Sequence, residues 1–200
     1  MNTLNIAEKL YVPLTKETAP EASRPVLEHV EKVFGFVPNL MGTLAGAPAT
    51  AKGYHALIFE FTKGSLSPQE QQLVLLAVSV ENKGSYCTLA HSATAKALAH
   101  VPADIINAVR NREPIADAKL NALISLTREL VRERGYADPE LVQAFIAAGY
   151  RKEQIMEILL GIAVKTISNY LDHISPVEID REFQSMRDAD VVVIEGRKTQ

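Results

Sequence analysis

Cys87 is the single cysteine of the 200-residue chain, and His91 follows it four residues later. On a helix, side chains at this spacing share one face and lean toward the N-terminus, so the His91 imidazole is directed back toward the sulfur. Ser85 is expected to cap the same helix, which places Cys87 in its first turn. Free amide donors and the positive end of the helix dipole favour thiolate over thiol there. The pair is therefore a candidate nucleophile with its proton-transfer partner.

A structural role for the pair stays open at this point. Free cysteine is among the most buried residue types, and a nearby histidine can simply satisfy a backbone carbonyl. His29, His55 and His100 carry weaker signals, and we assign them no chemistry. Since none of these histidines has a carboxylate partner at ligand spacing and there is one cysteine, no metal site is expected. No cofactor is expected either.

The elements that would position the pair are helices along nearly the whole chain. The clearest start is a capping box, with Ser67 as N-cap, Pro68 at the first helical position and Glu70 at the third. Helical spacing of apolar residues, ended by glycine or proline, predicts the other helices. The expected helices cover residues 25–34, a short second helix entered at 36–40, 48–63, 68–83, 86–100, 118–134, a segment from 139, and 152–174.

The composition indicates one domain with a substantial core, because 47% of the residues are hydrophobic and 22% are charged. The net charge of −3, with both signs interspersed, gives no basic field for nucleic acid or a membrane surface. A lone cysteine is typical of a reducing cytoplasm. The last long helix, 152–174, is apolar almost all round, which favours burial in the core or in a homo-oligomer contact.

We therefore predict an all-α, single-domain helical bundle. Its parts are an N-terminal arm at residues 1–20, a helical domain at 21–176 and a C-terminal tail at 177–200. Within the tail, residues 177–183 are a candidate short helix and 191–194 are a β-prone stretch. The end of the tail is expected to be loosely ordered or bound to a partner.

A family resemblance sharpens the functional expectation. Residues 66–79, followed by Asn82 and by 85–91, resemble the core motif of the alkylhydroperoxidase D and carboxymuconolactone decarboxylase family. That motif is a glutamate, eleven residues, Cys-x-x-Cys, three residues and a histidine. Residues 118–173 resemble the family's C-terminal helices. The resemblance implies an all-helical fold that assembles through helix faces, often as trimers or hexamers.

Carried over by position, the resemblance makes Cys87 the cysteine that attacks peroxide and His91 the motif histidine. Gly84 stands where the family has its resolving cysteine, so a Cys-x-x-Cys cycle is excluded. Gln72 stands at the acidic relay position, and an amide cannot transfer a proton near neutral pH. Ser85 is expected, with Gln72 and the adjacent Tyr86, to support the site.

Two glutamates near the motif are weak replacements for the missing acid. Glu70 is expected to be occupied by capping, and Glu81 lies on a helix face turned away from Gln72.

The leading hypothesis is an oxidoreductase in which Cys87 reduces a peroxide and an external thiol regenerates it. A second hypothesis is a decarboxylase or lyase acting on a small cyclic acid, which needs a general base and an anion-binding residue. A third is a non-catalytic oligomeric protein in which a buried Cys87 only packs.

Overall fold

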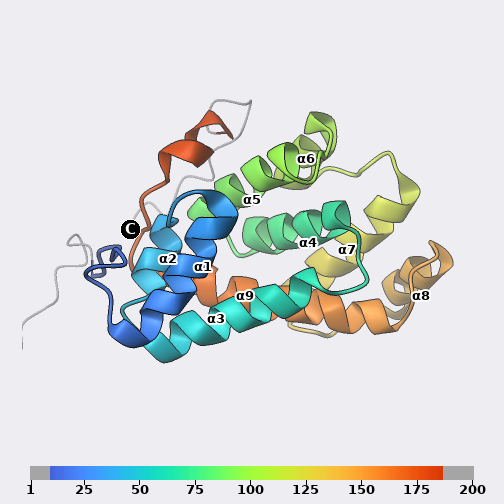
Figure 1. The fold of residues 1–200 in the computed structure, drawn as a ribbon. Coiled ribbons are helices and arrows are strands. Elements are labelled where there is room, and N and C mark those ends of the chain that lie inside the picture. The colour runs from blue at the N-terminus through green and yellow to red at the C-terminus, as the bar shows by residue number, and fades with distance from the viewer. Residues whose placement is uncertain (1–9, 187–200) are drawn as a thin grey trace, which may run out of the picture.

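The computed structural model describes residues 10–186, which form helices and no strand (Figure 1). The all-α expectation is confirmed. No helix in this part of the chain is both long and apolar enough to cross a membrane. The helices are η1 (Glu21–Ser23), α1 (Arg24–Phe34), α2 (Asn39–Leu44), α3 (Pro48–Thr62), α4 (Pro68–Glu81), α5 (Ser85–Ala97), α6 (Ala103–Arg110), α7 (Ala118–Arg132), α8 (Pro139–Ala147), α9 (Glu153–Ile174) and η2 (Arg181–Met186).

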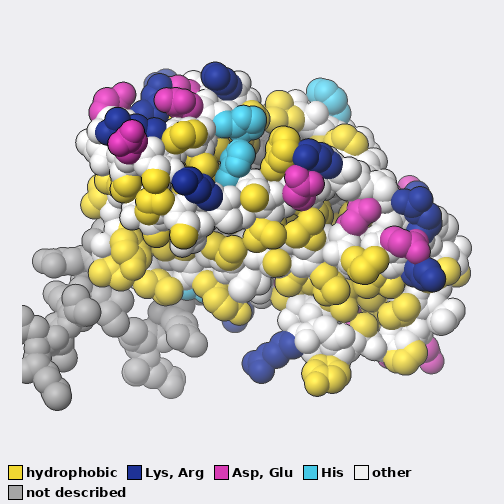
Figure 2. Space-filling model, turned by 60° about the horizontal axis from the view of Figure 1, so that its bottom comes forward, with side chains coloured by type: hydrophobic (Ala, Val, Ile, Leu, Met, Phe, Trp, Pro, Cys, Tyr) yellow, Lys and Arg dark blue, Asp and Glu magenta, His cyan; other side chains and the backbone are white. Residues whose placement is uncertain are grey.

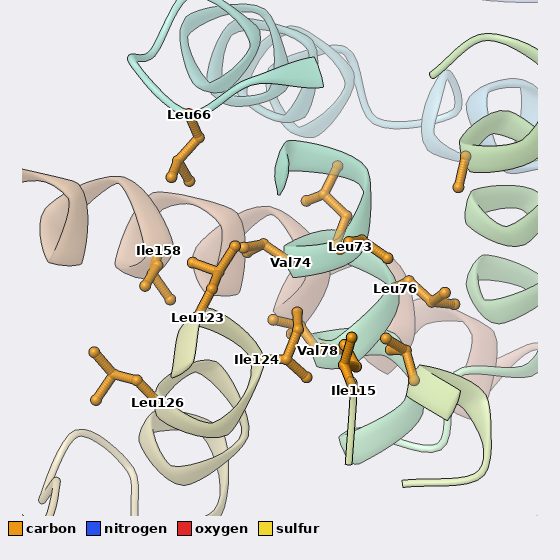
Figure 3. Packing of buried hydrophobic residues seen from close by; sticks show 14 of the residues in the cluster. Leu66, Leu73, Val74, Leu76, Val78, Ile115, Leu123, Ile124, Leu126 and Ile158 are labelled. Atoms are coloured by element: carbon orange, nitrogen blue, oxygen red, sulfur yellow. The ribbon is translucent and has the colours of Figure 1, made fainter. Parts of the chain in front are cut away.

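Helix α4 is the centre of the fold, with α5, α6, α7 and α9 packed around it (Figure 1). Every residue from Leu73 to Val80 is at most 1% exposed. Burial of each large apolar side chain contributes roughly 1.5–3 kcal/mol relative to exposure. Figure 3 shows Leu73, Val74 and Leu76 of α4 among side chains from α7 and α9. A helix that is apolar on all sides needs cover on all sides, which is why α4 lies inside.

The start of α4 is fixed by the predicted capping box. Oγ of Ser67 accepts a hydrogen bond from the Glu70 amide, and the Glu70 carboxylate accepts one from the Ser67 amide. At the other end, Lys83 adopts a left-handed φ of 59°, and the Gly84 amide donates to the Ser79 carbonyl. This tight turn starts α5 directly after α4, so the two helices lie side by side.

Helix α9 approaches α3 and α4 closely at Gly161. A Cβ atom at this position would lie 3.0 Å from the Phe61 ring and 3.1 Å from Val74. A larger residue would push α9 outward, because a packed core has no spare volume. The close approach carries the next turn of α9, with Lys165, into the interior, where Lys165 is 0% exposed.

Helix α6 was not predicted from the sequence. The start of the tail contains the short 3₁₀ helix η2, four residues later than the candidate helix at 177–183. Val177 and Phe183 are buried in the cluster that contains Tyr86 and Cys87, so this segment is part of the packed structure. The proposed boundaries at residues 20 and 176 stay a prediction. The β-prone stretch at 191–194 lies outside the described residues.

Candidate active site

A mostly apolar cavity of about 120 Å³ lies between the N-terminal helices, α5 and α9. Cys87 and His91 from α5 and Lys165 from α9 supply the chemically reactive part of its wall. The other lining residues are Val30, Phe34, Pro38, Leu40, Met41, Tyr54, His55, Ile58, Tyr86, Ala90, Thr94 and Phe183. Small apolar cavities with a few convergent polar groups are the usual form of a small-molecule site.

The Nζ atom of Lys165 contacts three acceptors. It lies 3.1 Å from the Tyr54 hydroxyl, 3.7 Å from Sγ of Cys87 and 2.8 Å from Nε2 of His91. An ammonium group has three N–H donors, so these contacts satisfy a charged Lys165 completely.

Charge balance links Lys165 to Cys87. Burial lowers the pKa of Lys165, but a negative charge on Cys87 and the contact with Tyr54 outweigh burial and raise it. A fully buried cation costs several kcal/mol unless an anion compensates it. Among the three side chains that contact Nζ, cysteine is the most acidic type, so Cys87 is the candidate for the compensating negative charge.

His91 is held as a neutral imidazole. Burial and the positive charge of Lys165 lower the pKa of His91 well below its usual 6.5. Nε2 accepts from the Lys165 ammonium, so the ring proton lies on Nδ1, which donates to Oε1 of Gln72 at 3.0 Å. The neutral amide of Gln72 thus fixes the tautomer of His91 and orients its ring.

The predicted direct pairing of Cys87 with His91 is corrected by this geometry. Both side chains lie at the cavity, as their spacing indicates, but both imidazole nitrogens of His91 are engaged with other residues. Lys165 contacts the sulfur and the imidazole and therefore connects them. Sγ of Cys87 also lies 3.4 Å from the hydroxyl of Ser168 on α9.

The first turn of α5 is capped from α9 and not by Ser85. Gly84 is the N-cap residue and offers no side chain. Instead, one carboxylate oxygen of Asp172 accepts hydrogen bonds from the Ser85 hydroxyl at 3.0 Å and the Tyr86 amide at 3.2 Å. The capping role predicted for Ser85 is wrong, because Ser85 is the first residue of α5 and the N-cap residue precedes the helix. Ser85 supports the site by tying α5 to α9.

Tyr86 joins α5 to the C-terminal segment. Its buried hydroxyl donates to Asp180, which also accepts from the Asn39 amide at 3.0 Å. Burial and the Asp180 carboxylate raise the pKa of Tyr86. The hydroxyl of Tyr86 is thus committed to a structural contact, while the side chain lines the cavity.

The place of the missing resolving cysteine is filled by Asn169. A Cβ atom at Gly84 would lie 2.7 Å from Cγ of Asn169, which is itself 0% exposed. Oδ1 of Asn169 accepts from the Asn82 side chain at 3.1 Å. Close packing of Asn169 against Gly84 leaves no room for a side chain at position 84.

The two nearby glutamates are occupied elsewhere, as expected. Glu70 caps α4 and accepts a hydrogen bond from the Tyr150 hydroxyl at 2.8 Å. Glu81 faces a cluster of guanidinium groups on α7 and the preceding loop, among them Arg132 at 2.9 Å and Arg128 at 3.7 Å. Neither carboxylate contacts His91.

Lys165 and Tyr54 were not predicted from the sequence as site residues. The signal for Lys165 was a single lysine inside the apolar stretch from Ile158 to Ile167. A lysine in such a stretch is buried with a partner or marks a boundary of the apolar face. Tyr54 offered no comparable signal because its helical spacing matched that of core residues.

Residues 47–129, which contain α4 and α5, match the model of the carboxymuconolactone decarboxylase family. Through this segment, the chain is similar to the carboxymuconolactone decarboxylase family. No curated protein is detectably similar to it in sequence.

Solved structures show that the fold is that of alkylhydroperoxidase D-like proteins. A peroxidase-related protein from Ralstonia eutropha JMP134, with an alkylhydroperoxidase core, is 21% identical at a TM-score of 0.75, covering 84% of this chain and 90% of that one. The debrominase Bmp8 is 20% identical at a TM-score of 0.76, covering 91% and 98%. A peroxidase-related protein from Silicibacter sp. TM1040 is 18% identical at 0.73, covering 88% and 94%.

Proposed function

We propose that the protein is a one-cysteine peroxidase that reduces a small hydroperoxide with the Cys87 thiolate. The contact between Nζ of Lys165 and Sγ of Cys87 carries this proposal. An ammonium ion at this distance favours the thiolate, which is the nucleophilic form of cysteine. The kinship with peroxidase-related proteins of the same fold supports the reaction class.

In the proposed first step, the Cys87 thiolate is the nucleophile and the Lys165 ammonium is the proton donor. The sulfur of Cys87 attacks the terminal oxygen of the hydroperoxide, the O–O bond breaks and an alkoxide leaves. Lys165 gives one proton to the alkoxide, so the products are a sulfenic acid, an alcohol and a neutral amine. His91 and Tyr54 hold Nζ in place through their hydrogen bonds.

The second half of the cycle needs an external thiol. Cys87 is the single cysteine and Gly84 is covered by Asn169, so the chain has no resolving thiol of its own. One external thiol converts the sulfenic acid to a mixed disulfide and water. A second thiol releases Cys87 and carries away the disulfide, and the released proton returns to Lys165. A reducing, cytoplasmic environment would supply such thiols.

The cavity favours a small apolar substrate. An apolar cavity of roughly 150 Å³ is large enough for benzene, and this one measures about 120 Å³. This volume favours hydrogen peroxide or an alkyl hydroperoxide of few carbon atoms.

The test is product analysis after stoichiometric tert-butyl hydroperoxide. The wild type should release one equivalent of tert-butanol and lose its free thiol, and a panel of external thiols should then support turnover. The Cys87→Ser variant, which keeps the size of the side chain, should release none. Intact hydroperoxide in the wild-type sample would reject the proposal.

A second candidate, a lyase acting on a cyclic carboxylic acid, is favoured by one observation. The buried cation of Lys165 and the neutral imidazole of His91 lie at the same cavity, as an anion-binding group and a general base would. This reaction does not need the sulfur. Its signature would be full activity in the Cys87→Ser variant.

We also propose that the chain forms a homo-oligomer through α9. Met156, Leu159, Ala163 and Tyr170 follow one another at three-, four- and seven-residue spacing, and all four are exposed. Figure 2 shows hydrophobic side chains spread over the face where α3, α8 and α9 lie. Large exposed apolar faces of this kind are typical of subunit contacts.

A further inference from the structure

In the proposed function, Lys165 stays protonated in the reduced site only while Cys87 carries a negative charge. Both side chains are buried, with Lys165 at 0% and Cys87 at 1% exposure. The two residues are 78 positions apart in the sequence, on α9 and α5. Oxidation of the thiolate to a sulfenic acid removes the negative charge. The ammonium then has no anion beside it.

Loss of that charge changes the chemistry of Lys165. The Cys87 thiolate is the main influence that raises the pKa of Lys165 against burial, and burial alone lowers it. In the proposed peroxide step, the ammonium has just given its proton to the leaving alkoxide. The oxidised site therefore holds a neutral primary amine, which is a nucleophile, next to an electrophilic sulfur.

No thiol competes with this amine inside the chain. Position 84, where a resolving cysteine would stand, is a glycine covered by Asn169. The imidazole of His91 accepts at Nε2 from Lys165 itself, 2.8 Å away, and donates from Nδ1 to Gln72. The Lys165 amine is thus the nucleophile within reach of the oxidised sulfur.

We propose that Lys165 resolves the sulfenic acid of Cys87 by forming a sulfenamide, a covalent N–S bond between α9 and α5. This inference rests on the proposed function, which supplies the sulfenic acid. The amine attacks the sulfur, the S–O bond breaks, and the hydroxyl leaves with one amine proton as water. Sulfenic acids are known to condense with nitrogen nucleophiles in this way.

The cross-link would protect the site between turnovers. A sulfenamide has no S–OH group for a second peroxide to oxidise, so Cys87 avoids the irreversible sulfinic state. An external thiol reverses it by attacking the sulfur, which returns the Lys165 amine and leaves a mixed disulfide. A second thiol then restores Cys87, as in the uncross-linked route.

The experiment compares the full-length wild type with Lys165→Arg after one equivalent of hydrogen peroxide in the absence of thiol. The wild type should lose the mass of two hydrogens, should not react with a dimedone-type sulfenic acid trap, and should yield one peptide pair joined through residues 87 and 165. Arginine keeps the charge but does not condense, so Lys165→Arg should react with the trap. Lys96→Arg, a change at an exposed lysine of α5, is the matched control and should behave as the wild type does.

The outcomes separate the inference from the proposed function. A wild type that is trapped as fully as Lys165→Arg and gives no joined peptide overturns the sulfenamide but leaves the peroxidase intact. A joined peptide that is one oxygen mass heavier overturns the condensation step. No oxidation of Cys87 in wild type overturns both. The joined wild-type peptide decides the question even where Lys165→Arg folds poorly.

Discussion

The side-chain amide of Asn169 packs against Gly84 and fills the space that a side chain at position 84 would occupy. The two residues come from α9 and from the turn before α5, and they complement each other in size. A glycine at position 84 and a medium-sized polar residue at 169 therefore form a matched pair.

The size match predicts that Gly84→Cys is destabilising and that shortening Asn169 relieves the cost. Overpacking of a buried site costs typically about 1–3 kcal/mol, and the single variant should lose unfolding free energy in this range. Gly84→Cys combined with Asn169→Ala should recover part of it in a double-mutant cycle. Chemical denaturation of the four proteins measures the coupling.

The same double variant should gain a redox pair. Residues 84 and 87 have the spacing of Cys-x-x-Cys motifs, so oxidation should produce an internal disulfide. Two outcomes would show that Asn169 does not control the space at position 84. One is that the changes in unfolding free energy of the two single variants add in the double variant, and the other is that the double variant stays a dithiol after peroxide.

The neutral state of His91 predicts a specific loss of stability in mild acid. Burial and Lys165 lower the pKa of His91, so the unfolded chain binds a proton at this residue where the folded chain does not. Stability is therefore complete above the unfolded value of about 6.5 and falls as the pH decreases, by up to about 1.4 kcal/mol per pH unit.

Thermal or chemical unfolding between pH 7 and pH 5 measures this slope. His91→Gln should reduce it, whatever its effect on absolute stability. His55, whose pKa is lowered by burial and by His29, contributes in the same direction, so His55→Gln serves as a comparison. An unchanged slope in His91→Gln would mean that the imidazole is protonated in the folded protein.

The exposed apolar face of α9 consists of Met156, Leu159, Ala163 and Tyr170. We predict that a charged substitution on this face dissociates the oligomer. Leu159→Glu and Met156→Glu place carboxylates on side chains that are 44% and 63% exposed in the single chain, so the fold itself should tolerate them. Light scattering at micromolar concentration should show an oligomer for the wild type and smaller species for both variants.

Tyr136→Glu is the control, because Tyr136 is 86% exposed and lies in the loop after α7, outside α9. It should leave the mass unchanged. A wild type that is already a monodisperse monomer would contradict the proposed assembly.

The sequence predicted the local parts of the site well. The capping box at Ser67 fixes the start of α4, and the turn at Gly84 fixes the start of α5, so Gln72 and His91 meet across two adjacent helices. These elements follow from short-range signals. The four-residue spacing on α5 then placed Cys87 and His91 on one face.

The sequence could not predict Lys165 in the site. Its position depends on the rotation and depth of α9, which are set by the close contact of Gly161 with Phe61, a hundred residues earlier in the chain. Spacing within one helix does not contain this information. For the same reason Asn169 and Asp172, which shape the start of α5 from α9, had no local signal for these roles.

The proposed function requires that Cys87 and Lys165 form an ion pair and not a neutral thiol beside a neutral amine. The thiolate has its own ultraviolet absorbance band, and reading it needs no reagent to enter the cavity. The most direct measurement is therefore the difference spectrum between wild type and Cys87→Ser, taken near neutral pH on folded protein, with Lys165→Met alongside. The account predicts a thiolate band in wild type at neutral pH that is weakened on the order of tenfold in Lys165→Met. A folded wild type without the band at neutral pH would contradict it.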